Sequence, residues 1–185
     1  ILKHSPLRDD CLGGGTFVNP AVSSSSKTNN TSYVNYQAML ATVATGVDLT
    51  NNTNYAAVGA QLDIDAFIDY ILLNFYLGNF DWSHQNWYAS FRRNHPLGRW
   101  RFHSWDAEHV LRTESEDFTN DNEASTPTFI HQRLATNAEY RMRFADRMYK
   151  WFFVGGLFTT ARLTAVCNRQ FDEIDSALRC ESARW

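Results

Sequence analysis

The sequence DIDAFIDYILLNFYLGNFDWSHQNWYASFRRNHPLGRWRFHSWDAE, residues 63–108, holds one helical pattern, one polar loop and two alternating runs. Apolar residues recur over 64–77 at the i, i+3, i+4, i+7 spacing of one helical face. Asp63 is suited to cap the start of this helix, and Gly78 is suited to end it. We therefore expect a helix with one buried face, followed by a loop over residues 79–86.

The two alternating runs, residues 87–93 and 99–105, predict an antiparallel hairpin. Residues 94–98 lie between them and have turn chemistry. If these five residues form the loop, counting back along the strands places Asn86 opposite Asp106. Facing residues in an antiparallel pair have Cβ atoms about 5 Å apart, so we expect these two side chains to meet at the open end of the hairpin.

Asp81 enters the same end of the hairpin, five positions before Asn86. Three oxygen-bearing side chains, those of Asp81, Asn86 and Asp106, would then share one site. Such ligands suit Mg²⁺ or Mn²⁺, with water and substrate phosphates in the remaining positions. The order of these residues matches protein kinases, which use a catalytic-loop Asp, an Asn five residues later and a second, metal-binding Asp.

The composition of the chain excludes several classes of protein and of binding partner. The chain has 185 residues, of which 44% are hydrophobic and 20% charged, which is typical of a globular domain and not of a disordered one. The net charge of −3 argues against a nucleic-acid partner. No apolar run is long enough to predict a membrane span. Three cysteines without a CxxC pair argue against a disulfide framework or a zinc site.

Outside residues 63–108, the sequence predicts loops and then helices. Residues 1–54 read as an irregular, loop-rich segment, with a short helix near residues 36–43. The acidic stretch 114–123 reads as a solvated loop that Pro127 ends. Helices are expected over 129–134, over a segment that Asn137 caps and that runs to about residue 154, and in a last segment that Thr159 or Thr160 caps. The whole predicts a mostly helical α+β protein.

The motifs Asn79-Phe-Asp-Trp82, Asn86-Trp87 and Trp105-Asp-Ala-Glu108 resemble those of the CotH kinase family, and residues 181–185 resemble the tail of CotH-type domains. This resemblance covers most of residues 55–185. It implies an atypical, minimal protein-kinase fold that transfers phosphate from ATP to Ser or Thr of protein substrates, with Mg²⁺ or Mn²⁺. It also implies exported or surface acceptors, and hence an extracytoplasmic or secreted location.

The resemblance assigns roles to individual positions. Asp81 would be the catalytic-loop Asp, and Asn86 and Asp106 the metal ligands. Glu108 could add a ligand or pair with an arginine. Tryptophans of the same motifs, Trp82 and Trp105 among them, would line the site and pack beneath it, with stacking on the adenine of the nucleotide as the second option.

Some features depart from the kinase pattern. Asp106 is followed by Ala107-Glu108 and not by Phe-Gly, and no His-Arg precedes Asp81. The three lysines are Lys3, Lys27 and Lys150, and none is predicted on a strand that is paired with a following helical Glu. We therefore expect residues 1–185 to be one partial domain, the C-lobe-like half of a kinase, with the nucleotide-covering lobe outside this chain and little activity in the fragment alone.

Other functions fit parts of the pattern. A bare D-x-x-x-x-N is a weak signal, and Asp81 alone could simply cap a turn. A cell-surface adhesion or interaction module could keep the fold without the chemistry, although it would have no need for three converging oxygen ligands. A metal-assisted hydrolase would need further ligands, and the loops near the hairpin offer only His84 and Glu108.

Overall fold

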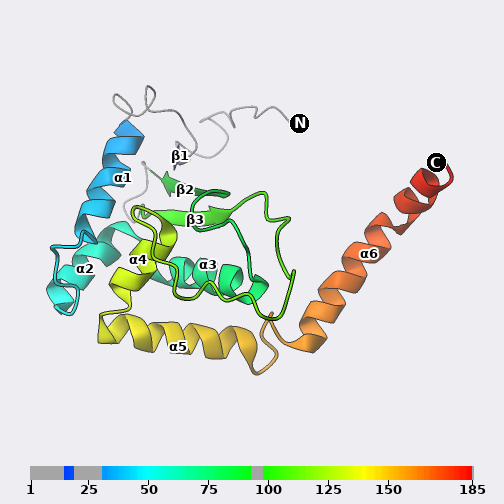
Figure 1. The fold of residues 1–185 in the computed structure, drawn as a ribbon. Coiled ribbons are helices and arrows are strands. Elements are labelled where there is room, and N and C mark those ends of the chain that lie inside the picture. Colours follow the sequence, from blue (N-terminus) through cyan, green and yellow to red (C-terminus); the bar gives the residue numbers. More distant parts are fainter. Residues whose placement is uncertain (1–14, 19–30, 93–97, 185) are drawn as a thin grey trace. The chain divides into compact units, whose positions relative to one another are not determined.

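A computed structural model gives the fold of residues 15–18, 31–92 and 98–184. The fold is α+β and mostly helical (Figure 1). The chain divides into two compact units, residues 1–142 and 143–185. The elements in chain order are β1 (Gly15–Val18), α1 (Thr31–Thr42), α2 (Asn52–Gln61), α3 (Ile64–Leu77), β2 (Trp87–Arg92), β3 (Arg101–Ser104), α4 (Pro127–Leu134), α5 (Ala138–Phe152) and α6 (Thr160–Ser182).

Helix α3 forms where the sequence predicts it. At its start, the Asp63 side chain accepts a hydrogen bond from the backbone N–H of Ala66 (3.3 Å). At its end, Gly78 adopts the left-handed conformation, with φ 54°. Both predicted ends of the helix are confirmed, and its apolar face is buried through Ile64, Phe67, Ile68, Tyr70, Ile71 and Leu72.

The predicted hairpin is present, but it belongs to a three-stranded antiparallel sheet of order β1-β2-β3. Strand β1 pairs with β2 from Gly15 opposite Arg92 to Val18 opposite Ala89. Strand β3 is shorter than the predicted run 99–105. Trp100 precedes it and bonds instead to the end of α2 and to the residues that join α2 to α3: its N–H donates to Gln61 O (2.7 Å), and its carbonyl accepts from Asp63 N (3.0 Å).

The predicted register of the hairpin is wrong by one residue. Trp87 pairs with Ser104 and Ala89 with Phe102, whereas the predicted register would have placed Trp87 opposite Trp105. The observed pairing puts the apolar residues of both strands on one face, and a slip of one residue would turn half of them to the other face. Burial of the apolar face therefore sets the register, and Asp106 does not lie opposite Asn86.

The core of the first unit lies between α3 and the inner face of the sheet (Figure 1). Phe67 of α3 meets Phe102 of β3 edge to face, with ring centroids 5.2 Å apart. Tyr36 of α1 meets Trp100 in the same way at 5.3 Å. Buried aromatic rings contribute large apolar areas, so this cluster fixes the sheet on α3 and with it the loop that joins α3 to β2.

The segment predicted to be irregular, residues 1–54, contains regular structure. Strand β1 and the whole of α1 lie in it, and α1 begins well before the expected residue 36. Helix α2 was not predicted at all, because its Asn-rich start reads as a turn. Asn51 is in fact the N-cap, and its side chain accepts a hydrogen bond from Thr53 N (2.8 Å), a use for which Asn is well suited.

The later helices follow the predicted order. Helix α4 begins at Pro127, two residues earlier than expected, because Pro is tolerated in the first turn of a helix. Asn137 caps α5 as predicted, accepting hydrogen bonds from the N–H groups of Glu139 (2.8 Å) and Tyr140 (3.2 Å). Thr159 is the N-cap of α6. The acidic stretch between β3 and α4 forms no helix or strand.

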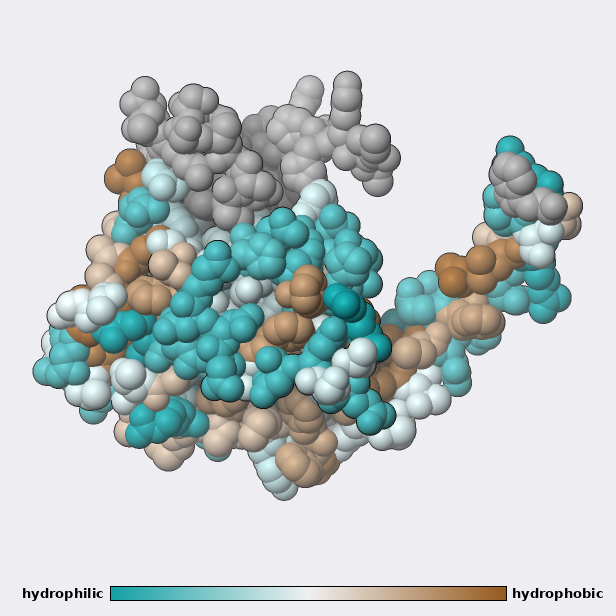
Figure 2. Space-filling view, in the orientation of Figure 1, coloured by the Kyte–Doolittle hydropathy of each residue, from teal (hydrophilic) through white to brown (hydrophobic). Residues whose placement is uncertain are grey.

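Helix α6 leaves its apolar face uncovered. None of its residues is buried, and Val166, Phe171, Ile174 and Leu178 are at least 36% exposed. Apolar side chains are visible on its surface in Figure 2. Cys167 and Cys180 lie on this helix, both with free thiols. In the part of the chain that the structure describes, no helix is long and apolar enough to span a membrane.

Candidate functional site

Asp81 is almost enclosed by the protein, with 6% of the residue exposed. Its Oδ2 accepts hydrogen bonds from Asn86 Nδ2 (2.7 Å) and Gln85 Nε2 (3.1 Å). Its Oδ1 is buried and has no hydrogen-bond partner among the described residues. A buried oxygen without a partner costs free energy, so Oδ1 is the atom of this carboxylate that an incoming hydroxyl or cation would satisfy.

Asn86 and Asp106 share an unusual backbone conformation. Their φ angles are 56° and 52°, in the left-handed region. Residues other than glycine adopt this region at a cost, although Asn and Asp do so more readily than most. Such residues are concentrated at functional sites, where the surrounding structure holds them in place. Two of the three residues with predicted oxygen ligands therefore carry a local strain that the fold maintains.

The segment that contains Asp106 is hydrogen-bonded at two points to the loop of residues 79–86, called the Asp81 loop from here on. At one end, Trp105 N donates to Asn86 O (2.9 Å). At the other, Phe80 N donates to His109 O (3.0 Å). Residues 105–109 thus form a short arch whose ends both bond to residues 80–86. This arch brings Asp106 next to the Asp81 loop even though the hairpin register differs from the predicted one.

The ring of Phe80 anchors the continuation of this segment. Arg112 lies over the ring, with its Cζ 4.7 Å from the centroid. Phe118 meets the same ring edge to face, with centroids 6.0 Å apart. Leu111 N also donates to Leu77 O (2.7 Å). The chain after Asp106 is therefore packed against the end of α3 and the start of the Asp81 loop.

The expected convergence of oxygen ligands is present only in part. Asp81 and Asn86 are in direct contact, but Asp106 and Glu108 are exposed. Glu108 Oε1 lies 3.4 Å from His109 Nε2. Within residues 15–18, 31–92 and 98–184, no three His, Cys, Asp or Glu side chains are grouped so that they could hold a metal ion.

The donors that are present fit a hard divalent cation by type. The Asn86 side-chain N–H donates to Asp81, so the amide oxygen of Asn86, a hard donor, is left for a cation. Asp106 and Glu108 add exposed carboxylates on the neighbouring arch. Mg²⁺ commonly takes only one or two carboxylates, with water and substrate phosphates completing its coordination, and this set matches such an open site better than an all-protein cage.

The two tryptophans of the predicted site differ in exposure. Trp82 is fully buried and packs edge to face against Tyr70 (5.6 Å) and Phe75 (5.7 Å). Trp82 therefore supports the loop from beneath and presents no open face on which an adenine could stack. Trp105 is 46% exposed, so it alone of the two offers a surface to a ligand.

The sequence patterns did not predict a buried hydrogen-bond network beneath the Asp81 loop. Asn74, on α3, and Asn79, in the loop, are buried and joined by a hydrogen bond of 2.9 Å. The signal was available, because Asn74 lies seven residues after Phe67 and so falls on the apolar face of the helix. A polar residue at a buried position implies partners for its side chain. Gln85, which contacts Asp81, had no such signal.

The histidines near the hairpin contribute differently. His103 projects from the outer face of the sheet, where its Nε2 bonds to Ser90 Oγ (2.8 Å) and its ring stacks on Tyr88 (4.7 Å). Burial and, to a lesser extent, the neighbouring Arg101 lower the pKa of His103. His103 is thus held within the fold, while His84 is exposed.

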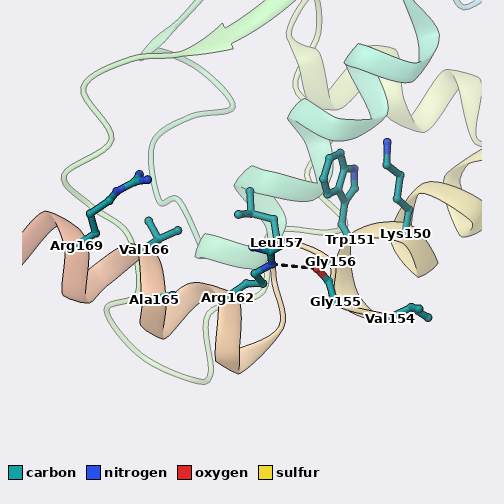
Figure 3. A pocket seen from close by; sticks show the side chains of 10 residues that line it. All are labelled: Lys150, Trp151, Val154, Gly155, Gly156, Leu157, Arg162, Ala165, Val166 and Arg169. Carbon is teal, nitrogen blue, oxygen red and sulfur yellow. Dashed lines mark hydrogen bonds between the residues drawn. The ribbon is translucent and has the colours of Figure 1, made fainter.

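A separate cavity of about 690 Å³ lies within the second unit. Figure 3 shows it between the end of α5 and the start of α6, with Arg162 donating to Gly155 O (3.4 Å). Its cationic lining comes from Lys150, Arg162 and Arg169, and the Lys150 Nζ lies 4.4 Å from the centroid of the Trp151 ring. None of the predicted site residues lines this cavity. Lys150 is helical, as the sequence predicts.

The fold and the loop define an α+β protein in which an Asp-x-x-x-x-Asn loop connects a helix to a hairpin that leads into a second Asp. The family model described as CotH kinase protein matches residues 17–185. The chain therefore belongs to the CotH kinase family, as the sequence motifs indicated, and this membership indicates a kinase-related function. Neither a search of curated proteins nor a search of solved structures gave a match.

Proposed function

We propose that this chain carries the catalytic and metal-binding half of an ATP-dependent protein kinase that phosphorylates Ser or Thr. The observation that carries the proposal is the environment of Asp81. Its carboxylate is buried and held at Oδ2 by Asn86 and Gln85, and Oδ1 has no partner among the described residues. A carboxylate oriented in this way is suited to accept a proton from an acceptor hydroxyl.

In the proposed reaction, the acceptor oxygen attacks the γ-phosphorus of ATP. The new O–P bond forms as the bond from that phosphorus to the β–γ bridging oxygen breaks, and ADP leaves. The hydroxyl proton passes to Asp81. Phosphoryl transfer depends mainly on positioning and charge stabilisation, so the contribution of Asn86 and Gln85 is to keep the Asp81 carboxylate in one orientation.

The residues proposed to hold Mg²⁺ or Mn²⁺ are Asn86 and Asp106, with Glu108 as an additional donor. When bound, the cation would neutralise charge on the phosphates. Trp105 is proposed to contact the nucleotide through its exposed ring. By analogy with the family, the acceptors are proposed to be exported or surface proteins, and the location extracytoplasmic.

A titration of the full-length protein with Mn²⁺ tests the metal assignment. In the presence of ATP, Asp106→Ala is expected to weaken Mn²⁺ binding by about ten-fold or more, as measured by electron paramagnetic resonance. Asp117→Ala is the matched control, because it removes an exposed carboxylate of the segment that follows the arch. Equal Mn²⁺ affinity in both variants would contradict the assignment.

A second function, a non-catalytic cell-surface interaction module, is favoured by one observation. Asp81, Asp106 and Glu108 do not form a three-carboxylate metal group among the described residues. A module of this kind would bind neither ATP nor Mn²⁺. Calorimetric titration of the full-length protein with ATP separates the two functions, because a kinase binds the nucleotide more tightly when Mn²⁺ is present.

A further inference from the structure

Asn74 is the centre of a buried hydrogen-bond network at the end of α3. Its Oδ1 accepts hydrogen bonds from Asn79 Nδ2 (2.9 Å) and Ser104 Oγ (3.0 Å), and its Nδ2 donates to Tyr70 O (2.8 Å). Only 1% of Asn74 is exposed. Its side chain therefore meets three partners from three parts of the chain, all within the first unit.

The two donors to Asn74 Oδ1 occupy equivalent places in the site. Asn79 lies two residues before Asp81, and Ser104 lies two residues before Asp106. One amide oxygen thus joins the segment that leads to the proposed base and the segment that leads to the proposed metal ligand. A second link joins the same two segments nearer the proposed site, where Trp105 N donates to Asn86 O (2.9 Å).

The network is not needed to end the helix. The backbone carbonyl of Asn74 accepts the N–H groups of Gly78 and Asn79, and any residue at this position would supply that carbonyl. An apolar side chain would also continue the buried face of α3. The side-chain amide at this position therefore has a different use, and two of its partners, Asn79 and Ser104, lie just before Asp81 and Asp106.

We propose that Asn74 is a positioning residue that fixes the Asp81 loop relative to the Asp106 segment. The inference rests on the proposed function, because it assigns Asn74 a role in the same site. Two catalytic groups on separate segments must keep a fixed separation for phosphoryl transfer, and small displacements lower the rate strongly. Asn74 supplies this constraint without contacting substrate.

The sharpest variant is Ser104→Ala in the full-length protein. Asn74→Ala removes all three side-chain bonds from a closed core, whereas Ser104→Ala removes one bond and leaves the bond to Asn79. Ser90→Ala is the matched control, because it removes another half-buried hydroxyl of the same hairpin, bonded to His103 on the outer face of the sheet. Ser104→Thr retains the hydroxyl and is the rescue variant.

Three readouts are measured in each variant: amide hydrogen exchange at Trp105, Mn²⁺ affinity with ATP present, and kcat. We expect Ser104→Ala to speed exchange at Trp105 and to lower both Mn²⁺ affinity and kcat by about ten-fold, with KM for the acceptor unchanged. Ser90→Ala should change none of these, and Ser104→Thr should restore them.

Unchanged exchange at Trp105 in Ser104→Ala would overturn the inference whatever the activity. Equal effects of Ser104→Ala and Ser90→Ala on kcat would also overturn it. If the parent protein transfers no phosphate, the proposed function fails by itself. Exchange and Mn²⁺ affinity then decide the inference: losses confined to Ser104→Ala support it, and equal Mn²⁺ affinity in the two variants overturns it.

Discussion

The side-chain amide of Asn86 donates a hydrogen bond of 2.7 Å to Oδ2 of Asp81. Asn86 makes this contact from a left-handed backbone conformation, with φ 56°. The contact holds the Asp81 carboxylate at Oδ2, and because it uses the side-chain N–H of Asn86, the amide oxygen of Asn86 is left for the proposed cation. One hydrogen bond thus connects the proposed base to the proposed metal ligand.

Asn86→Gly distinguishes the effect of the Asn86 side chain on metal binding from the effect of its left-handed backbone on stability. Glycine adopts positive φ without penalty, so the substitution removes the amide while relieving strain. We expect the melting temperature to change little, because the lost hydrogen bond and the relieved strain offset each other. Mn²⁺ affinity with ATP present should fall by about ten-fold or more, as measured by titration of the full-length protein.

Ser125→Gly is the control for this prediction. Ser125 also has positive φ, 66°, but it is exposed and lies outside the site. The same backbone change at Ser125 should leave Mn²⁺ affinity unaltered. If Asn86→Gly binds Mn²⁺ as tightly as Ser125→Gly does, Asn86 is not a metal ligand.

Gly78→Ala tests how the end of α3 sets the start of the Asp81 loop. The φ of Gly78 is 54°, and a Cβ added there would meet only Glu116 atoms at 3.9 Å or beyond. The cost is therefore conformational, and we expect a loss of about 1 kcal/mol in the free energy of unfolding, measured by urea denaturation. Gly46→Ala, where nothing lies within 4 Å and φ is not positive, should not destabilise; an equal loss there would contradict this account.

His131 makes the stability of the first unit depend on pH. Its Nδ1 bonds to the hydroxyl of buried Tyr140 (2.9 Å), and its burial lowers the pKa to about 4. The unfolded chain, with a His pKa of about 6.5, binds more protons between these two values. We therefore expect the contribution of His131 to the free energy of unfolding to be fully present above about pH 6.5 and to fall by about 3 kcal/mol as the pH drops toward 4.

Urea unfolding at pH 7 and pH 5 measures this dependence. His131→Gln cannot be protonated in this range and should reduce the difference in stability between the two pH values. His84→Gln, at an exposed position, should retain the full difference. The same pH dependence in all three proteins would show that another group is responsible.

The sequence was sufficient for the elements that local chemistry determines. Asp63 and Gly78 mark the ends of α3 because capping and left-handed backbone are properties of single residues. The Asp81–Asn86 contact also followed, because only four loop residues separate the two positions and keep their side chains near each other. Helix α2 was not predicted because Asn is common both in turns and at helix N-caps, so Asn51 alone does not distinguish the two.

The register of the hairpin and the placement of Asp106 depend on longer-range packing. Loop length alone gave a register that was one residue out, whereas the common burial of Trp87, Ala89 and Phe102 sets the observed one. Two backbone hydrogen bonds join the arch that carries Asp106 to the Asp81 loop. Trp105 N donates to Asn86 O, and His109 O accepts from Phe80 N. Such backbone bonds between loops leave no pattern in a sequence.

In the proposed function, Asp81 and Asp106 act together in phosphate transfer from ATP. The most direct measurement incubates the full-length protein with labelled ATP and Mn²⁺ and follows label on protein. We expect label in the parent and in the Asp117→Asn control, and a loss of about 10² to 10⁴ in rate in Asp81→Asn and Asp106→Ala, with folding retained. Equal labelling of the parent and both site variants would contradict it.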